Sequence, residues 1–121
     1  MGHEGLQQKG TDNTVPAYNK LVRDKIPQII IADGKKCTLK TLSEDEYAKE
    51  LREKLGEELR EYLEVEDGRD AIEELADLME LIHALAGVHG ATPEELEQVR
   101  SKKAEERGGF TEKVFLIDVE E

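Results

Sequence analysis

The chain has 121 residues, of which 38% are charged, with a formal net charge of −12 and a single cysteine, Cys37. That length suits one domain with a modest core. The acidity argues against general binding to nucleic acid or to an anionic membrane, and one cysteine excludes an intrachain disulfide and a thiolate zinc cage. No segment has the apolar length of a membrane span or of a secretory signal, so we expect a soluble cytoplasmic protein.

The N-terminal part divides into a lead and the start of a domain. Residues 1–16 are polar, contain glycine and show no periodicity, so we interpret them as a flexible lead and residues 17–121 as a single domain. A short helix should follow, with Asp24 as its cap and a proline in its first turn, and Gly34 should end it. Residues 37–42 alternate weakly between apolar and polar side chains and predict a short strand.

Two long helices are expected next. Each should begin at a capping box, in which an N-cap side chain and an acid three residues later bind each other's backbone amides. Ser43 should open the first helix, which we expect to end near Val65, and Asp70 should open the second, which we expect to end near Gly87. The turn between them is short, so the two helices are predicted to lie antiparallel and side by side.

A fourth helix and a C-terminal strand complete the predicted elements. The helix should begin at Thr92, with a proline in its first position, and end at Arg107 before two glycines. Residues 112–119 predict a strand that could pair with residues 37–42. The expected fold class is therefore mainly α, an antiparallel helical hairpin or bundle with a small β-ribbon. The chain has no tryptophan and only 4% aromatic residues, so its core should be thin and oligomerisation is expected.

Four acids on the long helices lie on the side of the apolar residues. With about 100° between successive residues, Glu58 lies inside the apolar stripe of its helix and Glu61 on its margin. Glu74 and Asp77 take the same two positions on the next helix. An ionised carboxylate directed at a core is costly unless it is paired or binds a metal. Pairing with a base such as Lys54 is the alternative, but the repeated phase favours a metal site.

Basic residues form two clusters. Arg100, Lys103 and Arg107 lie on the apolar side of the fourth helix, and the second cluster lies near the start of the domain and contains Lys20, Arg23 and Lys25. They can contact phosphate, or they can be the surface counterweight of an acidic chain. The two glycines after the fourth helix could let backbone amides approach a phosphate, or could simply end the helix.

Carboxylates and basic clusters together suit a metal-complexed polyphosphate. Mg²⁺, with Mn²⁺ as an alternative, prefers oxygen ligands and lowers the pKa of an attacking water, while lysine and arginine offset phosphate charge. No Ser-His-Asp or Cys-His set is apparent, so a covalent intermediate is not expected. We predict no chemical role for Cys37, His83 and His89.

Three segments of the chain resemble a known family. Glu57-Glu58-x-x-Glu61 followed by Glu74-x-x-Asp77 resembles the EExxE…ExxD signature of the MazG-type superfamily of all-α nucleoside triphosphate pyrophosphohydrolases. The lead-in Asn19-Lys-Leu-Val-Arg-Asp-Lys-Ile-Pro27 and the tail Lys103-Ala-Glu-Glu-Arg-Gly-Gly-Phe110 are similar to its small house-cleaning branch, which is often described as phosphoribosyl-ATP pyrophosphohydrolase-like. The resemblance covers about residues 18–119.

The resemblance implies an activity, an assembly and a set of site residues. The activity is Mg²⁺-dependent cleavage between the α and β phosphates, which yields a nucleoside monophosphate and pyrophosphate, in a homodimer or homotetramer. The implied metal ligands are Glu58, Glu61, Glu74 and Asp77. The implied catalytic acids are Glu57, Glu58 and Glu61, of which Glu57 would orient water. The predicted phosphate contacts are Lys103, Arg107, Lys20, Arg23 and Lys25.

Two other functions stay open on the sequence alone. One is a phosphoribosyl-ATP pyrophosphohydrolase of histidine biosynthesis, which would use the same acids on a different nucleotide. The other is a non-catalytic helical module that binds nucleotide or a protein partner. The complete set of four acids favours an enzyme, and the exposed acidic surface expected of this chain favours a module.

Overall fold

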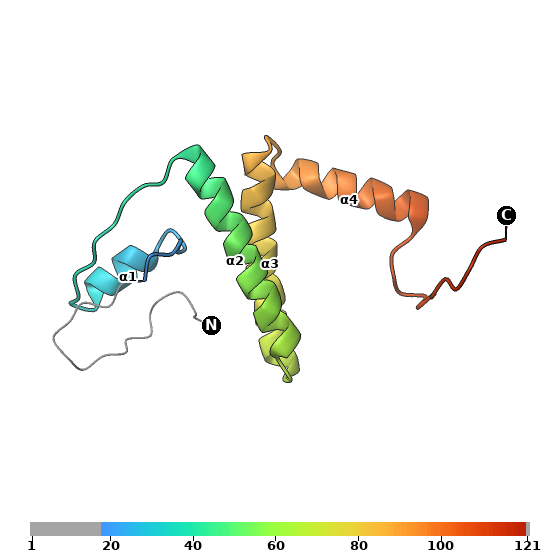
Figure 1. Ribbon diagram of the computed structural model, residues 1–121, viewed down its shortest axis with the longest axis horizontal. Helices are drawn as coiled ribbons and strands as arrows, with labels where there is room; N and C mark the ends of the chain where they lie inside the picture. The colour runs from blue at the N-terminus through green and yellow to red at the C-terminus, as the bar shows by residue number, and fades with distance from the viewer. Residues whose placement is uncertain (1–17, 121) are drawn as a thin grey trace.

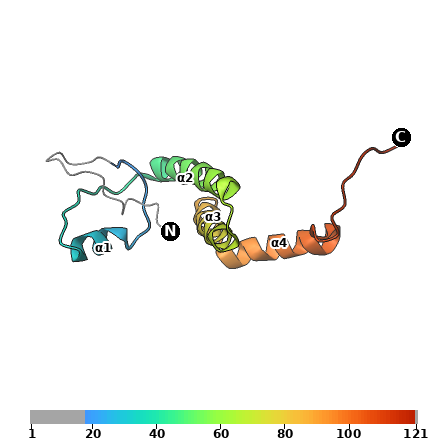
Figure 2. The same cartoon turned by 90° about the horizontal axis from the view of Figure 1, so that it is seen from below.

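The computed structural model describes residues 18–120, so the predicted lead, residues 1–16, lies outside the described residues. Its helices are α1 (Ile26–Ala32), α2 (Glu44–Glu64), α3 (Gly68–Val88) and α4 (Pro93–Arg107). Figure 1 shows α2 and α3 side by side, with α1 on one side and α4 leading away on the other. Seen from below in Figure 2, α2 and α3 remain adjacent and α4 still runs away from them. The fold is mainly helical, as predicted.

Side-chain caps begin α2 and α4 where the sequence predicts them. Ser43 Oγ accepts a hydrogen bond from Glu46 N (3.2 Å), and Glu46 Oε1 accepts one from Ser43 N (3.0 Å). Thr92 and Glu95 form the same reciprocal pair at α4, at 2.9 and 3.1 Å. The predicted capping box at Ser43 and the predicted cap at Thr92 are therefore confirmed, and both satisfy backbone amides that have no partner inside the helix.

The start of α3 differs from the prediction. Its N-cap is Asp67, whose Oδ1 accepts a hydrogen bond from Arg69 N (2.8 Å), so the predicted capping box at Asp70 is wrong. Asp67 is an equally good cap and comes three residues earlier, so the helix begins there and Asp70 lies in its first turn. The connection between the long helices is thus shorter than expected, which draws the end of α2 and the start of α3 together.

The predicted cap of α1 is also wrong. Lys25, and not Asp24, occupies the N-cap position, and it makes no side-chain capping hydrogen bond. Pro27 in the first turn has no N–H to offer a cap, and the amide of Ile26 already bonds to the Arg23 carbonyl at 3.1 Å. A side-chain cap would therefore find few donors to satisfy here.

The apolar core within the described chain is small. Its buried apolar residues are Ile26, Leu51 and Leu81. Leu51 lies on α2 and Leu81 on α3, the two helices that pack along one another. The same hairpin also buries charged side chains, which the next section describes. None of the helices in the described range is both long enough and apolar enough to cross a membrane.

Neither segment of the predicted β-ribbon forms a strand in residues 18–120. Residues 37–42 precede α2, whereas residues 112–119 follow α4, and Figure 1 shows these two segments at opposite ends of the molecule. A strand needs a partner for its backbone hydrogen bonds, and α4 carries the second segment away from the first. The predicted ribbon rested on the alternation of apolar and polar residues, which carries no information about the direction of α4.

Candidate metal centre

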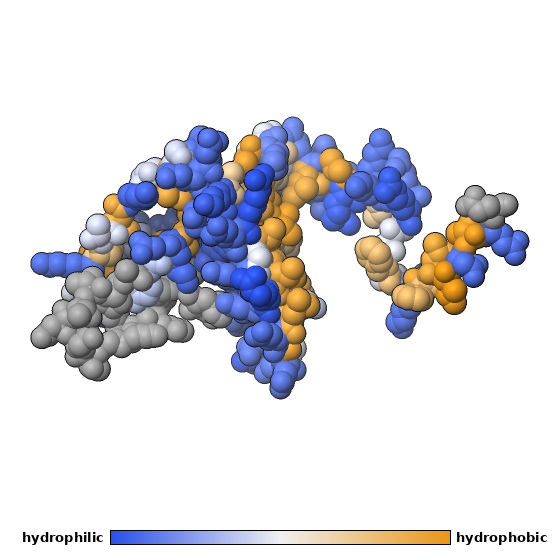
Figure 3. Space-filling view, viewed as in Figure 1, coloured by the Kyte–Doolittle hydropathy of each residue, from blue (hydrophilic) through white to orange (hydrophobic). Residues whose placement is uncertain are grey.

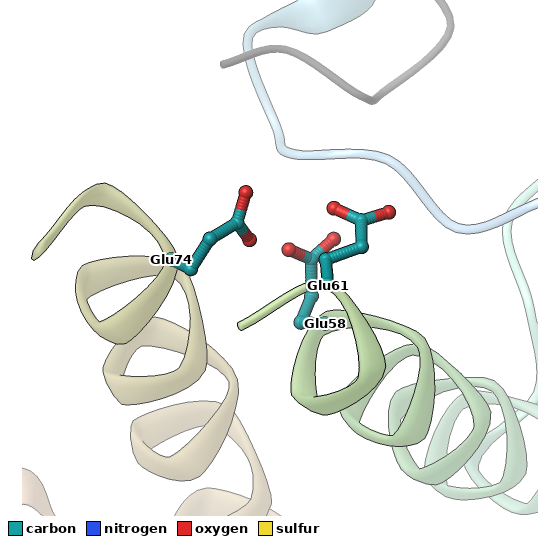
Figure 4. A group of neighbouring side chains, drawn as sticks. All are labelled: Glu58, Glu61 and Glu74. Carbon is teal, nitrogen blue, oxygen red and sulfur yellow. The ribbon is translucent and has the colours of Figure 1, made fainter. Parts of the chain in front are cut away.

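The end of α2 and the start of α3 position three acids. Glu58 and Glu61 lie one turn apart in the last two turns of α2, and Glu74 lies in the second turn of α3. Because residues 65–67 form a short turn, these parts of the two antiparallel helices face each other. Figure 4 shows the three carboxylates directed toward one another from the two helices.

The three carboxylates are close enough to share one ion. Glu58, Glu61 and Glu74 each offer an oxygen, and these oxygens all lie within 4.8 Å of one another. Oxygens on opposite sides of Mg²⁺ are about 4.2 Å apart, and those around a larger ion such as Ca²⁺ reach about 5 Å. Small side-chain rotations would therefore bring the three acids around a cation. The sequence prediction that these three acids share one face of the hairpin agrees with this geometry.

Burial makes Glu58 the most unusual of the three acids. Glu58 is only 2% exposed, and its Oε1 accepts no hydrogen bond. Glu74 is 7% exposed, and the Oε1 atoms of Glu61 and Glu74 are shielded from solvent as well. A buried carboxylate oxygen without a donor is costly, so it is expected to face a proton or a cation.

Electrostatics of the cluster are dominated by acids. Burial raises the pKa of Glu58 to about 8, and a hydrogen bond shared with Glu74 and the charges of Glu61 and Asp77 act in the same direction. Lys54, the base considered in the sequence analysis, is buried one turn before Glu58. Every group that shifts the pKa of Glu58 nevertheless raises it. In the absence of a cation, this raised pKa favours the protonated form of Glu58, which relieves the repulsion.

Asp77, the fourth predicted ligand, is held differently. Its Oδ1 accepts a hydrogen bond from Arg23 Nη2 at 2.6 Å, with side chains 25% and 46% exposed. Asp77 lies one turn after Glu74, and its charge reaches Glu58, but it does not join the group of three. Arg23 precedes α1, so this ion pair ties the N-terminal part of the described chain to α3. It also places one predicted phosphate contact beside the acids.

The other predicted site residues lie on the surface. Glu57 is exposed on α2, next to Glu58 but off the buried face, and Lys20 and Lys25 are exposed around α1. Lys103 and Arg107 are exposed on α4. Cys37 and His83 are half-buried, His89 is exposed, and none of the three belongs to the acid group.

Within one chain, α4 does not reach the acids. It begins where α3 ends, and Glu74 lies 14 residues before that end at Val88, about 20 Å along the helix axis. Figures 1 and 2 both show α4 leading away from the hairpin. Arg100 pairs instead with Glu97 on its own helix, at 2.6 and 2.8 Å. The structure thus brings three acids and Arg23 together and leaves Lys103 and Arg107 apart from them.

Sequence reasoning missed the link between Arg23 and Asp77. These residues are 54 positions apart, and no local pattern connects them. Lys54 did carry a signal, because its spacing of four residues from Glu58 places both on one face of α2. Its burial follows from packing between helices, which spacing alone does not predict.

Comparisons with known proteins give little to add to this geometry. No family model matches the chain, and no solved structure matches it at a significant level. An uncharacterized protein of Mycolicibacterium smegmatis is 50% identical over 52 residues, which is 43% of this chain and 52% of that protein. The chain therefore spans about half the length of the curated relative it matches, and that relative's description carries no activity.

Proposed function

We propose that this chain is a Mg²⁺-dependent nucleoside triphosphate pyrophosphohydrolase of the MazG type. It cleaves between the α and β phosphates, releases a nucleoside monophosphate and pyrophosphate, and removes unwanted nucleotides from the cytoplasm. The observation that carries the proposal is Glu58, a carboxylate that is almost fully buried, with an oxygen that accepts no hydrogen bond, inside a group of three acids from two helices.

The donor set fits a hard divalent cation. Glu58, Glu61 and Glu74 offer only carboxylate oxygens, which Mg²⁺ and Mn²⁺ accept readily, and no thiolate or imidazole lies in the group. A bound Mg²⁺ polarises phosphoryl oxygens and lowers the pKa of a water molecule. Asp77 lies one turn from Glu74 and would join the ligands if Arg23 released it.

The side chains around the acids divide the remaining tasks. Glu61 is half-buried, with the open side that a group needs to accept a proton from a water. Arg23 holds its guanidinium beside the acids and can donate paired hydrogen bonds to a phosphate that displaces Asp77. Glu57 is exposed, so its proposed part is to orient water at the rim. Lys103 and Arg107 can take part only from another copy of the chain or after a movement of α4.

The experiment is a substrate screen with detection of pyrophosphate in the presence of Mg²⁺. Standard, deoxy and modified nucleoside triphosphates are tested beside phosphoribosyl-ATP, which separates house-cleaning from histidine biosynthesis. We expect pyrophosphate release that EDTA abolishes and that Glu58→Gln and Glu74→Gln remove. The matched surface variants Glu53→Gln on α2 and Glu80→Gln on α3 should keep it, because both residues are exposed.

Two results would redirect the proposal. Release of orthophosphate in place of pyrophosphate would mean that a different phosphoanhydride bond is cleaved. Metal binding at the three acids without turnover of any nucleotide would indicate the non-catalytic module. The separation of Lys103 and Arg107 from the acids within one chain is the observation that favours this second candidate.

A further inference from the structure

The C-terminal segment of the described chain, residues 110–119, is apolar and uncovered; we refer to it as the tail. Phe110 is 98% exposed, Phe115 87% and Ile117 85%, and Val114, Leu116 and Val119 are also mostly exposed. Figure 3 shows this apolar surface at the far end of the molecule, beyond α4. Folded chains that stay alone in water rarely leave so many neighbouring apolar side chains open to solvent.

A second apolar surface lies along α3. Ile72, Leu75, Met79 and Ile82 recur at spacings of three, four and three residues, so they share one face of the helix. Each is between 42% and 65% exposed. This α3 stripe is centred about 120° around the helix from Glu74, so it is not the face that carries the acid group. Figure 3 shows a continuous apolar band along α3.

The tail needs more cover than its own chain offers. In an extended segment, Val114 and Leu116 point to one side and Phe115 and Ile117 to the other, so both sides are apolar. Packing against an apolar surface covers one of these two sides at a time. Within its own chain, α4 directs the tail away from the α3 stripe (Figures 1 and 2).

The junction between α4 and the tail leaves the tail's direction open. Gly108 ends α4 with a φ of +83°, a backbone conformation that residues other than glycine rarely adopt. A Cβ placed on Gly108 or Gly109 would meet no atom within 4 Å, so the side of the chain where each Cβ would lie is open at both positions. The tail can therefore reach a surface on a neighbouring molecule without disturbing α4.

We propose that the tail of one copy packs on the α3 stripe of a second copy, and that the two copies exchange tails about a two-fold axis. Each chain has one tail and one stripe, so two copies satisfy each other and the assembly closes. A phenylalanine buries about 150–250 Å². The tail carries two, along with four aliphatic residues, and the stripe carries four more apolar residues. Together they supply the order of the roughly 800 Å² per partner that stable interfaces bury.

Isotope-encoded cross-linking tests which copy receives the tail. Phe115 is replaced by the photoreactive benzoylphenylalanine in the full chain, and ¹⁵N-labelled and unlabelled copies are unfolded together, refolded and irradiated. We expect tail peptides joined to α3 peptides that contain Met79, with the two labels mixed within one cross-linked pair. Pairs in which both peptides always carry the same label would show that the tail folds back on its own chain, and absence of α3 peptides would place it elsewhere; either result overturns the proposal.

Sedimentation velocity tests whether the contact holds the copies together. We expect the wild type to sediment as at least two copies at micromolar concentration, and Leu116→Asp and Met79→Asp each to shift it to one copy. Thr111→Asp, an exposed polar position in the tail, is the matched control and should leave the mass unchanged. Circular dichroism identifies a variant that has lost its helices. A Leu116→Asp protein that keeps its helices and its mass would refute the exchange, whether or not the chain hydrolyses nucleotides.

Discussion

Two regions of the molecule depart from the usual placement of side chains, in which apolar groups are buried and charged groups exposed. One is the hairpin of α2 and α3, and the other is α4 with the tail. The hairpin buries Lys54, Glu58 and Glu74, which are charged types, whereas the tail exposes Phe110 and Phe115. Burial of charge and exposure of apolar surface both cost free energy in an isolated chain. We therefore propose a cation as the partner of the hairpin and a second copy as the partner of the tail.

The difference between the two regions lies in how far each is assembled. In the hairpin, helix caps, a short turn and packing between helices already bring the acids within 4.8 Å. In the region of α4, the helix itself is well capped, but Lys103, Arg107 and the tail are exposed and lie apart from the acids in residues 18–120. On the proposed function, one folded chain would suffice to hold the metal, whereas a part for α4 in catalysis would need a second copy or a movement of α4.

The largest effect should come from removing an acid of the hairpin. Glu74→Gln keeps the side-chain shape and loses the charge, so we expect loss of Mg²⁺ or Mn²⁺ affinity beyond the roughly 10–100-fold typical of residues that only support metal ligands. Isothermal titration with Mn²⁺ measures it, with Glu80→Gln as the exposed control on the same helix. Unchanged affinity in Glu74→Gln would remove the three acids from consideration as a metal site.

Arg107 tests the other side of the comparison. Loss of one charge-assisted hydrogen bond to phosphate costs about 1.5–3 kcal/mol, so Arg107→Ala should lower kcat/KM by roughly one to two orders of magnitude. Its metal affinity should not change, because α4 does not reach the acids in one chain. His83→Ala, on α3 but outside the acid group, should alter stability more than turnover.

Mixing variants sharpens this result. If Arg107 acts from a second copy, a mixture of Glu74→Gln and Arg107→Ala chains should regain part of the activity that each lacks alone. Reassembly by unfolding and refolding together is needed before the assay. Recovery of activity would mean that the two regions form one site shared between copies. If activity is not recovered although the chains still assemble, the site lies within single chains.

Local signals predicted the helices well and their connections less well. Ser43 and Thr92 begin helices as expected, because capping depends on residues within one turn. Asp67 displaced Asp70 at α3 because several acids nearby are equally good caps, and sequence does not rank them. The prediction of a β-ribbon was wrong because the pairing of two strands depends on the path of the chain between them, here through α4.

Helical phase also predicted much of the candidate site. Glu58, Glu61 and Glu74 face one another because their positions on the two stripes fix their direction once the helices lie side by side. The same argument grouped Asp77 with them, and there it missed Arg23, which arrives from a distant part of the chain. It also directed Lys103 and Arg107 inward from the apolar side of α4, whereas both are exposed in the part of the chain that the structure describes.

Glu58 gives the hairpin a distinctive dependence on pH. Its pKa rises from 4.5 to about 8 on folding. Between these two pH values, the folded state keeps a proton on Glu58 that the unfolded state has released. Stability without metal is therefore greatest below about pH 4.5 as far as Glu58 contributes, and that contribution falls as the pH rises toward 8. Thermal melts in EDTA should show a decline across this window, and Glu58→Gln should flatten it.

Metal should reverse that trend. A divalent ion binds the deprotonated carboxylates, so the increase in Tm caused by MgCl₂ should grow between about pH 5.5 and 8. The tail offers a comparison, because Leu116→Asp removes no acid from the hairpin and should leave the pH profile in place. An equal effect of MgCl₂ at both pH values would mean that the ion binds somewhere other than at Glu58.

The smallest effect on stability is expected at the ion pair that joins the N-terminal part of the described chain to α3. Arg23 and Asp77 are partly exposed, with side chains 46% and 25% accessible, so Arg23→Ala should cost only about 0.2–1 kcal/mol of folding free energy, and less at high salt. Urea denaturation at low and high NaCl measures this cost.

The consequence of Arg23→Ala for the site should be larger than its consequence for stability, because Asp77 is then free to turn toward Glu74. We therefore expect Arg23→Ala to bind Mn²⁺ at least as tightly as the wild type while losing turnover through the missing phosphate contact. A variant with weakened Mn²⁺ binding would show instead that Arg23 positions Asp77 for the metal.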